Sequence, residues 1–215
     1  GQSYVTNVPP DLTNAVAIAA GGMHALALRA DGTVAGWGYY SPDQARVPPY
    51  LSNVVALAAS YHHNLALKTD GTVEVWGDSG LAFSAPPDLT NAIAVAAGYA
   101  HSLALRADGT VAAWGQNSAG QTDVPPDLTN VIAIAAGETS SLALRADGTL
   151  WAWGYGFSGE TGNGTIWGAT TPLPIQTNVM WRAVAARADQ TAALRADGTL
   201  WTWGYNQYGQ LGNGA

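Results

Sequence analysis

The sequence contains no cysteine, which excludes disulfides and thiolate metal sites and leaves the redox compartment undetermined. Only 11% of the 215 residues are charged, and Phe occurs twice against nine Trp and nine Tyr. Eight Lys and Arg stand against fifteen Asp and Glu, a formal net charge of −7. No apolar run reaches the roughly 18–20 residues that cross a bilayer as a helix. We therefore expect no membrane insertion.

The basic residues are scattered along the chain. Binding to a phosphate backbone requires clustered basic residues, whereas here they occur singly, once per repeat: Arg29, Lys68, Arg106, Arg145 and Arg195. We predict no nucleic-acid binding. The sequence begins at Gly1 rather than Met, so we also expect a processed form or a fragment.

Catalytic motifs are missing as well. The chain has no H-E-x-x-H, no G-x-S-x-G, no phosphate-binding glycine loop and no EF-hand loop. The glycine-rich run at 159–165 lacks the Lys of a phosphate loop, so we expect a long turn there. The sequence predicts a non-enzymatic protein with no catalytic residues, no cofactor and no metal site.

One phrase dominates what is present. "DGTVAGWG" at 31–38 recurs with small changes at 70–77, 108–115, 147–154 and 197–204. Its tryptophan returns at intervals of roughly 40 residues, except for a longer last interval that contains an insertion within 155–181. The period predicts a single repeat domain, 1–215, with five repeats at approximately 8–44, 48–83, 86–121, 125–160 and 172–210.

Each repeat has the pattern of short antiparallel strands. In the first strand, residues such as Val55 and Leu57 alternate with alanine, and so narrow a face suits a strand near a crowded axis. A second strand, an Asp-Gly turn predicted to be type I′, and a third strand ending in Trp-Gly follow. A fourth strand is expected near 44–47 and its equivalents. The pattern favours an all-β fold, a β-propeller of four-stranded antiparallel blades, over a stacked solenoid.

These residues also carry a family resemblance. The segment "GYAHSLALRADGTVAAWGQNSAGQ" at 98–121 resembles the repeat of the regulator of chromosome condensation family, whose pattern is G-x-x-H-S-x-A-L, D-G and then W-G-x-N-x-x-G-Q. The pattern recurs five times and covers essentially the whole chain. Linkers such as "GQTDVPPDLTN" at 120–130 are similar to those of secreted bacterial members, among them a β-lactamase-inhibiting propeller. The resemblance implies a propeller and an extracellular or cell-surface location in a bacterium.

The chain departs from this family in blade number, because the family norm is seven and five repeats are present. Three interpretations remain open: part of a larger ring, a closed five-bladed ring, or an open array that pairs with other copies. The fifth repeat also departs, with Arg187 and Gln190 in place of the family Gly and His, and Arg182 where other repeats hold Val or Ile.

Three residue columns are best explained by structure. His24, His63 and His101 share one repeat position, which Ser140 and Gln190 complete. Equivalent positions of adjacent blades lie too far apart for one metal ion, so we expect hydrogen bonding. We assign the Asp of each Asp-Gly pair to turn formation. The tryptophans before glycine are assigned to packing between blades: Trp37, Trp76, Trp114, Trp153 and Trp203.

Specificity must then come from the turns that vary. In an antiparallel meander, the first and third turns of a blade lie on one face, and the second turn and the linker lie on the other. The first and third turns are variable and rich in aromatic residues, and such loops on a rigid scaffold are where recognition concentrates. The predicted partner-binding residues are Met23, Tyr39, Tyr40, Tyr61, His62, Tyr99, Tyr155, Phe157, Tyr205 and Tyr208.

We therefore predict a protein-binding scaffold, a secreted or surface-displayed bacterial propeller that recognises a partner protein through this face. The alternative is a structural protein that forms oligomers or filaments with itself through blade edges. Inhibition of an enzyme of the β-lactamase type and nucleotide exchange are disfavoured. The acidic balance, the five repeats and the linker all argue against an exchange factor.

Overall fold

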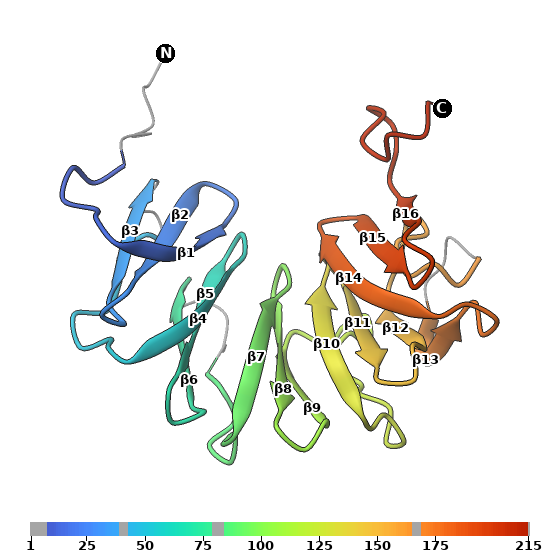
Figure 1. The fold of residues 1–215 in the computed structure, drawn as a ribbon, viewed down its shortest axis with the longest axis horizontal. Helices are drawn as coiled ribbons and strands as arrows, with labels where there is room; N and C mark the ends of the chain where they lie inside the picture. Colours follow the sequence, from blue (N-terminus) through green and yellow to red (C-terminus); the bar gives the residue numbers. More distant parts are fainter. Residues whose placement is uncertain (1–7, 39–42, 79–83, 165–168, 215) are drawn as a thin grey trace.

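Five antiparallel sheets follow one another along the chain and are arranged as blades around a centre (Figure 1). This computed structural model describes residues 8–38, 43–78, 84–164 and 169–214. The strands are β1 (Ala15–Ala20), β2 (His24–Arg29) and β3 (Val34–Gly38); β4 (Val54–Ala59), β5 (His63–Lys68) and β6 (Val73–Gly77); β7 (Ala92–Ala97), β8 (His101–Arg106) and β9 (Val111–Gly115); β10 (Val131–Ala136), β11 (Ser140–Arg145), β12 (Leu150–Gly154) and β13 (Ala169–Ile175); β14 (Trp181–Arg187), β15 (Gln190–Arg195) and β16 (Leu200–Gly204). No helix that could span a membrane occurs within these ranges.

The predicted four-stranded blade is found only in the fourth sheet among the described residues, and the other four sheets have three strands. The segment 44–47 lies beside β3, so closely that a Cβ on Gly36 would come within 2.4 Å of the Ala45 oxygen, yet it forms no ladder. Pro48 and Pro49 follow at once, and proline cannot donate to a ladder. The insertion within 155–181 gives the fourth repeat the length for β13.

The predicted type I′ turn is wrong. In each Asp-Gly hairpin only the glycine has positive φ, for example 79° at Gly32. The Gly32 nitrogen donates to the Arg29 oxygen at 3.0 Å, and Arg29 pairs with Thr33, which makes a three-residue loop ending in a left-handed glycine. Asp31 Oδ1 accepts from both the backbone nitrogen and the hydroxyl of Thr33. The turn therefore requires Asp-Gly-Thr rather than Asp-Gly alone.

The first strand of every blade is the innermost one, as the alanine pattern predicted (Figure 1). Each of these strands has an irregularity in register at its start, for example between Val54 and Ala56. The extra residue, Val55, is 50% exposed, whereas Leu57 packs into a core. The simple alternation of apolar and alanine faces thus holds only after the bulge.

The hydrophobic core is divided among the spaces between blades. Leu26 and Leu28 of β2 pack against Trp76 of the next blade. The same arrangement of two leucines and the following tryptophan recurs between the second and third, third and fourth, and fourth and fifth blades. Packing of the tryptophan column between blades is confirmed at these four interfaces.

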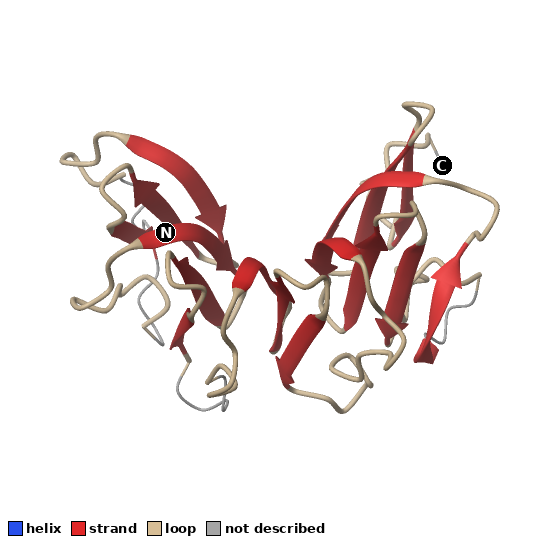
Figure 2. Ribbon diagram, turned by 60° about the horizontal axis from the view of Figure 1, so that its bottom comes forward, coloured by secondary structure: helices blue, strands red, loops and turns tan. Residues whose placement is uncertain are grey.

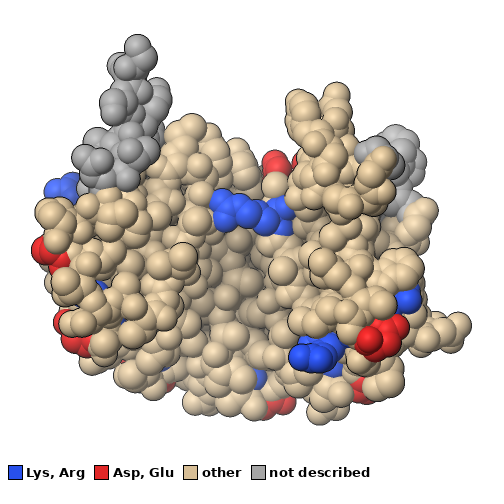
Figure 3. Space-filling view, turned by 45° about the horizontal axis from the view of Figure 1, so that its top comes forward, with Lys and Arg blue, Asp and Glu red and all other residues tan. Residues whose placement is uncertain are grey.

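The five blades form an open arc, with the first and last blades on either side of a gap (Figures 1 and 2). Arg187 crosses this gap. Its Nη1 and Nη2 donate to the Ala20 and Gly21 oxygens of the first blade, at 2.6 and 2.7 Å. Figure 3 shows Lys or Arg atoms between the two arms, on a surface that is otherwise mostly uncharged. The ends of the arc therefore approach closely enough for one long side chain to join them.

A polar contact accompanies each apolar interface. His101 Nε2 lies 3.0 Å from Ser141 Oγ of the next blade, and Ser141 Oγ donates to the Gln121 oxygen at 2.7 Å. That oxygen also accepts from Trp153 Nε1 at 3.0 Å. His24 and His63 make the matching contacts to Asn64 and Ser102. The predicted hydrogen-bonding role of the histidine column is confirmed.

The fourth interface lacks the histidine part of this contact. Thr191 Oγ1 and Trp203 Nε1 both donate to the Glu160 oxygen at 2.8 Å, so the carbonyl remains paired. Ser140 replaces the histidine, and its buried Oγ has no hydrogen-bond partner. A buried hydroxyl without a partner costs about 1–3 kcal/mol. The interface between the fourth and fifth blades is therefore the least complete of the four.

Acid should destabilise the protein through two histidines. Burial lowers the pKa of His63 to about 3 and that of His101 to about 4, against 6.5 for a free imidazole. Below pH 6.5 the unfolded chain takes up protons that the folded protein does not, so the free energy of unfolding should fall as the pH drops from 6.5 to 4. Urea titrations of a His63→Gln/His101→Gln variant should show a shallower fall.

The comparison with this variant isolates the histidines. Burial raises the pKa of Glu138, Glu160 and Asp189, which acts in the opposite direction but equally in both proteins. Equal slopes for the two proteins would show that the histidines do not control acid stability.

Restoring the missing histidine should stabilise the fourth interface. In Ser140→His, the new Nε2 should reach Thr191 of the next blade, as His101 Nε2 reaches Ser141. Gly137 leaves room for the imidazole, as Gly98 does for His101. One additional buried hydrogen bond contributes about 1 kcal/mol, or about 2–4 °C in Tm for a chain of this size. Thermal unfolding measures the change, with Thr139→His as a neighbouring control. A lower Tm for Ser140→His alone would contradict this account of the interface.

Candidate protein-binding face

The first and third turns of the blades meet on one side of the molecule, as predicted. The nitrogen of the first residue after the third strand donates to an oxygen in the first turn of the same blade at 2.8–2.9 Å, at Asp78, Gln116, Tyr155 and Tyr205. We call this side the turn face. The Asp-Gly turns lie with the linkers instead, since Val54 donates to Gly32 and Ala92 donates to Gly71.

Three predicted residues form one aromatic cluster on the turn face: Tyr61, His62 and Tyr99. The rings of Tyr61 and Tyr99 are stacked, with centroids 5.6 Å apart and an interplanar angle of 23°. The His62 ring lies edge-on to Tyr99 at 4.4 Å. Tyr61 is 46% exposed and Tyr99 is 38% exposed. The cluster therefore joins the second and third blades and presents apolar rings with polar ends to solvent.

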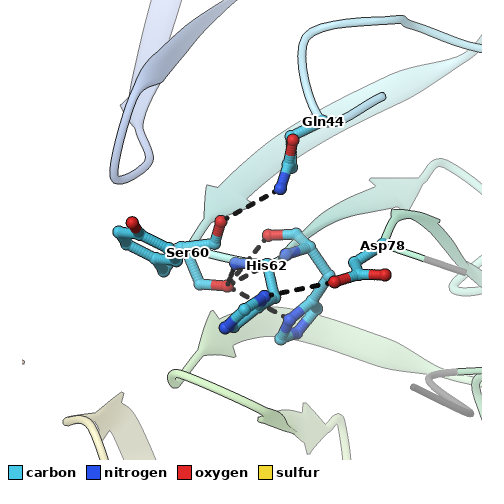
Figure 4. A network of polar contacts seen from close by, with 6 residues as sticks. Gln44, Ser60, His62 and Asp78 are labelled. Carbon is cyan, nitrogen blue, oxygen red and sulfur yellow. Dashed lines mark hydrogen bonds and ion pairs between the residues drawn. The ribbon is translucent and has the colours of Figure 1, made fainter. Parts of the chain in front are cut away.

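Hydrogen bonds hold the turn that carries this cluster (Figure 4). Ser60 Oγ accepts from the backbone nitrogens of His62 and His63 at 3.3 and 3.2 Å. Gln44 Nε2 donates to the Tyr61 oxygen, and His62 Nδ1 lies 3.4 Å from Asp78 Oδ2. The Tyr61 ring also covers Gly22, where a Cβ would lie 2.3 Å from the ring. The turn that carries Tyr61 and His62 is thus held in place by contacts within the chain.

The other predicted residues are distributed around the turn face. Met23 is 59% exposed in the first blade. Tyr155 packs edge-on against Phe157 at 4.1 Å, and Tyr205 against Tyr208 at 6.1 Å. Tyr39 and Tyr40 lie outside the described residues. The structure therefore brings together one cluster of three residues and two separate pairs.

A pocket of about 450 Å³ opens at the centre of the turn face, and the first turns of all five blades contribute to it. Its walls include the last alanine of the first strand in blades two to five: Ala59, Ala97, Ala136 and Ala186. Tyr61, Tyr99, Glu138 and Arg187 also line it. Hydrogen bonds between adjacent first turns fix its rim, such as Glu138 nitrogen to Ala188 oxygen at 2.8 Å.

Charge is unevenly distributed around this axial pocket. Burial, together with the charge of Asp189, raises the pKa of Glu138. Burial also raises the pKa of Asp189 itself. Arg187 acts electrostatically on His24, whose pKa it helps to lower after the larger effect of burial. Sequence reasoning singled out the aromatic turns but missed the pocket. The available signals were Arg187 in a Gly column and Glu138 in a first turn.

The described residues contain no group of three or more His, Asp or Glu side chains that could hold a metal ion. The histidines that share a column are used between blades. The Asp of each Asp-Gly turn accepts hydrogen bonds from the threonine two residues later. These bonds lower the pKa of the carboxyl group, as at Asp31. The described part of the turn face therefore presents aromatic side chains together with a few charged groups.

Comparison with known proteins agrees with this architecture. The model of the regulator of chromosome condensation (RCC1) repeat matches residues 92–121, 131–160 and 183–210, which lie in the third, fourth and fifth blades. Over 93% of the chain, the fold matches Prp20p from Saccharomyces cerevisiae at 25% identity with a TM-score of 0.76. The third, fourth and fifth blades therefore contain RCC1-type repeats. Comparison with curated protein sequences gave no significant match.

Two further structures show the same fold. Human WBSCR16 matches 88% of the chain at 21% identity, with a TM-score of 0.73 over 61% of its own length. The ectodomain of the Arabidopsis thaliana receptor kinase ACR4 matches 95% of the chain at 22% identity, with a TM-score of 0.69 over 70% of its own length. For Prp20p the match covers 59% of that chain, so the present chain spans about three-fifths of its length.

Proposed function

We propose that this RCC1-type chain is a non-enzymatic scaffold that binds another protein through the turn face. The observation that carries the proposal is the aromatic cluster, because Tyr61 and Tyr99 are exposed and also held by packing and hydrogen bonds. Rigid, partly exposed aromatic residues are typical hot spots of protein interfaces. Binding through such residues costs little side-chain entropy.

The structural neighbours support a role in protein binding. Prp20p binds Gsp1p and histones, and yeast RCC1 (Prp20) has been crystallised with Kap60. The partner of this chain is defined by its own turns. From the linker resemblance we propose in addition that the protein acts outside the cell or at the cell surface of a bacterium.

Removing the stacked rings should weaken partner capture. We expect the Tyr61→Ala/Tyr99→Ala variant to lose at least about tenfold in affinity for the partner, because two hot-spot side chains are truncated. Quantitative affinity capture followed by mass spectrometry identifies proteins that bind the wild type and not this variant. Isothermal titration calorimetry with the purified partner then measures the loss of affinity.

The control variant for this experiment is Tyr50→Ala. Tyr50 is a tyrosine in a linker, 70% exposed and bonded to Glu74. It should retain full capture, and circular dichroism at the assay temperature should show that both variants remain folded. Undiminished capture by the double variant would reject the turn face as the binding surface.

A second function, self-assembly, is favoured by the exposed faces of the two end blades. Ile18 is 80% exposed, whereas its equivalents Leu57 and Val95 pack into cores between blades. Leu200 is 68% exposed, whereas its equivalent Leu150 is fully buried. Each end of the arc thus exposes apolar side chains that a neighbouring blade covers elsewhere in the array. Contact between the first blade of one copy and the last blade of another is heterologous, and it gives a filament where the rotation between copies does not close a ring.

Self-assembly is measured by size-exclusion chromatography with light scattering over a range of concentrations. If the ends pair, the mass should rise with concentration, and Leu200→Glu should return the protein to a monomer by placing a charge in the contact. Val55→Glu, a change of similar exposure inside the arc, should leave the mass unchanged. A monomer at the highest concentration would exclude assembly.

A further inference from the structure

The axial pocket has features that the proposed function does not use. Its volume of about 450 Å³ lies in the range of ligand-binding pockets, about 300–1,000 Å³. It is too large to be filled by one methyl group, and methyl groups and backbone of the first turns form most of its wall. It lies beside the aromatic cluster, because Tyr61 and Tyr99 belong to the cluster and also line the pocket. A partner that contacts the aromatic cluster therefore lies next to the pocket.

The acidic side of the pocket favours a positive charge. Glu138 is half-buried in the wall, and its carboxylate is destabilised by burial and by Asp189. Asp189 follows Ala188, which also lines the pocket, and it is destabilised by burial. A cation beside these two carboxylates would stabilise their charged forms, because both are partly desolvated and carry the same charge.

The one cation in the wall does not serve this purpose. The Arg187 guanidinium lies toward the first blade, where it donates to the Ala20 and Gly21 oxygens. Its charge affects His24, and it is not among the groups that shift the pKa of Glu138 or Asp189. Positive charge is thus held at the gap, and negative charge at the fourth and fifth blades.

The aromatic rim supports the same ligand chemistry. Tyr61 and Tyr99 stack on each other with an interplanar angle of 23°, and both line the pocket. The phenol oxygen of a tyrosine can accept a hydrogen bond from an ammonium or guanidinium group. The alanine wall suits the aliphatic stem that carries such a group in Lys and Arg.

From this combination we infer that the axial pocket receives a lysine or arginine side chain, presented by a loop of the protein partner. The stem lies along the alanine wall, the charged end approaches Glu138, and Tyr61 and Tyr99 flank the entrance. The inference rests on the proposed function and names the chemistry of the partner that the turn face recognises.

The test uses small probes in place of the partner. Chemical-shift changes in the full chain are measured by NMR with the capped peptide acetyl-Gly-Lys-Gly-amide and its neutral norleucine counterpart, and with spermidine. The lysine peptide should bind about tenfold more tightly than the norleucine peptide. It should shift the signals of Ala97, Ala136 and Tyr99, which line the pocket. Glu138→Gln should reduce its affinity about tenfold.

Two further variants complete the design. Asp189→Asn, outside the wall, should reduce lysine-peptide affinity by a smaller factor, and it replaces Glu138→Gln if that variant does not fold. Glu74→Gln, which removes a remote carboxylate on β6, should change nothing. Equal binding of the lysine and norleucine peptides, or full affinity in Glu138→Gln, would overturn the inference. Tighter binding of spermidine than of the lysine peptide would overturn the partner loop as the source of the cation.

The outcomes separate this inference from the proposed function. Partner capture that depends on Tyr61 and Tyr99 but is unchanged in Glu138→Gln leaves the scaffold function in place and rejects the pocket. Lysine-peptide binding without any capture through the turn face rejects the scaffold function and leaves a cation-binding pocket.

Discussion

The linker carbonyl that pairs with the next blade, described at Gln44, Gln121 and Glu160, is the contact on which the architecture depends. At Gln121 it accepts from the hydroxyl of Ser141 and from the indole of Trp153, both in the next blade. The tryptophan can bury its ring against the leucines of the preceding blade only because its polar nitrogen is paired there. Apolar burial and polar pairing are therefore satisfied by the same side chain. A blade without a neighbour loses both at once.

This dependence explains why the repeated phrase varies so little. Asp-Gly-Thr forms the turn, and the carbonyl of a linker asparagine pairs with that turn, as Asn53 pairs with Thr69. Asn53 has a φ of 57°, a conformation that asparagine tolerates better than most residues. Each repeated residue serves a contact that every blade must make. Variation is concentrated in the first and third turns, where backbone atoms make the recurring contacts, and these turns carry the aromatic cluster.

Much of the fold could be predicted from the sequence because its determinants are local or repeat with a fixed period. The strands, the side on which the turns meet and the packing of Trp76, Trp114 and Trp153 all follow from period and alternation. The hairpin type was wrong because Asp-Gly is compatible with two loop lengths, and the backbone pairing of Arg29 with Thr33 decides between them. The fourth strand was overestimated because the proline pair leaves too few residues to pair.

The candidate site was only partly predictable. Individual aromatic residues could be named from their turns, but stacking of Tyr61 on Tyr99 depends on the spacing of two blades. The pocket combines residues from five repeats, and no local pattern encodes such convergence. The different environments of Glu138 and Arg187 also arise from their places on the arc.

Arg187 has a mechanical consequence. It fastens the two ends of the arc at the turn face, where its guanidinium meets the ends of β1 and the following turn. On the side of the Asp-Gly turns, no backbone pairing between the first and fifth blades occurs within the described ranges, whereas each other pair of neighbours has one. In the described part of the chain, the first and fifth blades are therefore linked on the turn face only. On the side of the Asp-Gly turns these two blades can move apart more easily, so their amide hydrogens should exchange faster there than at the turn face.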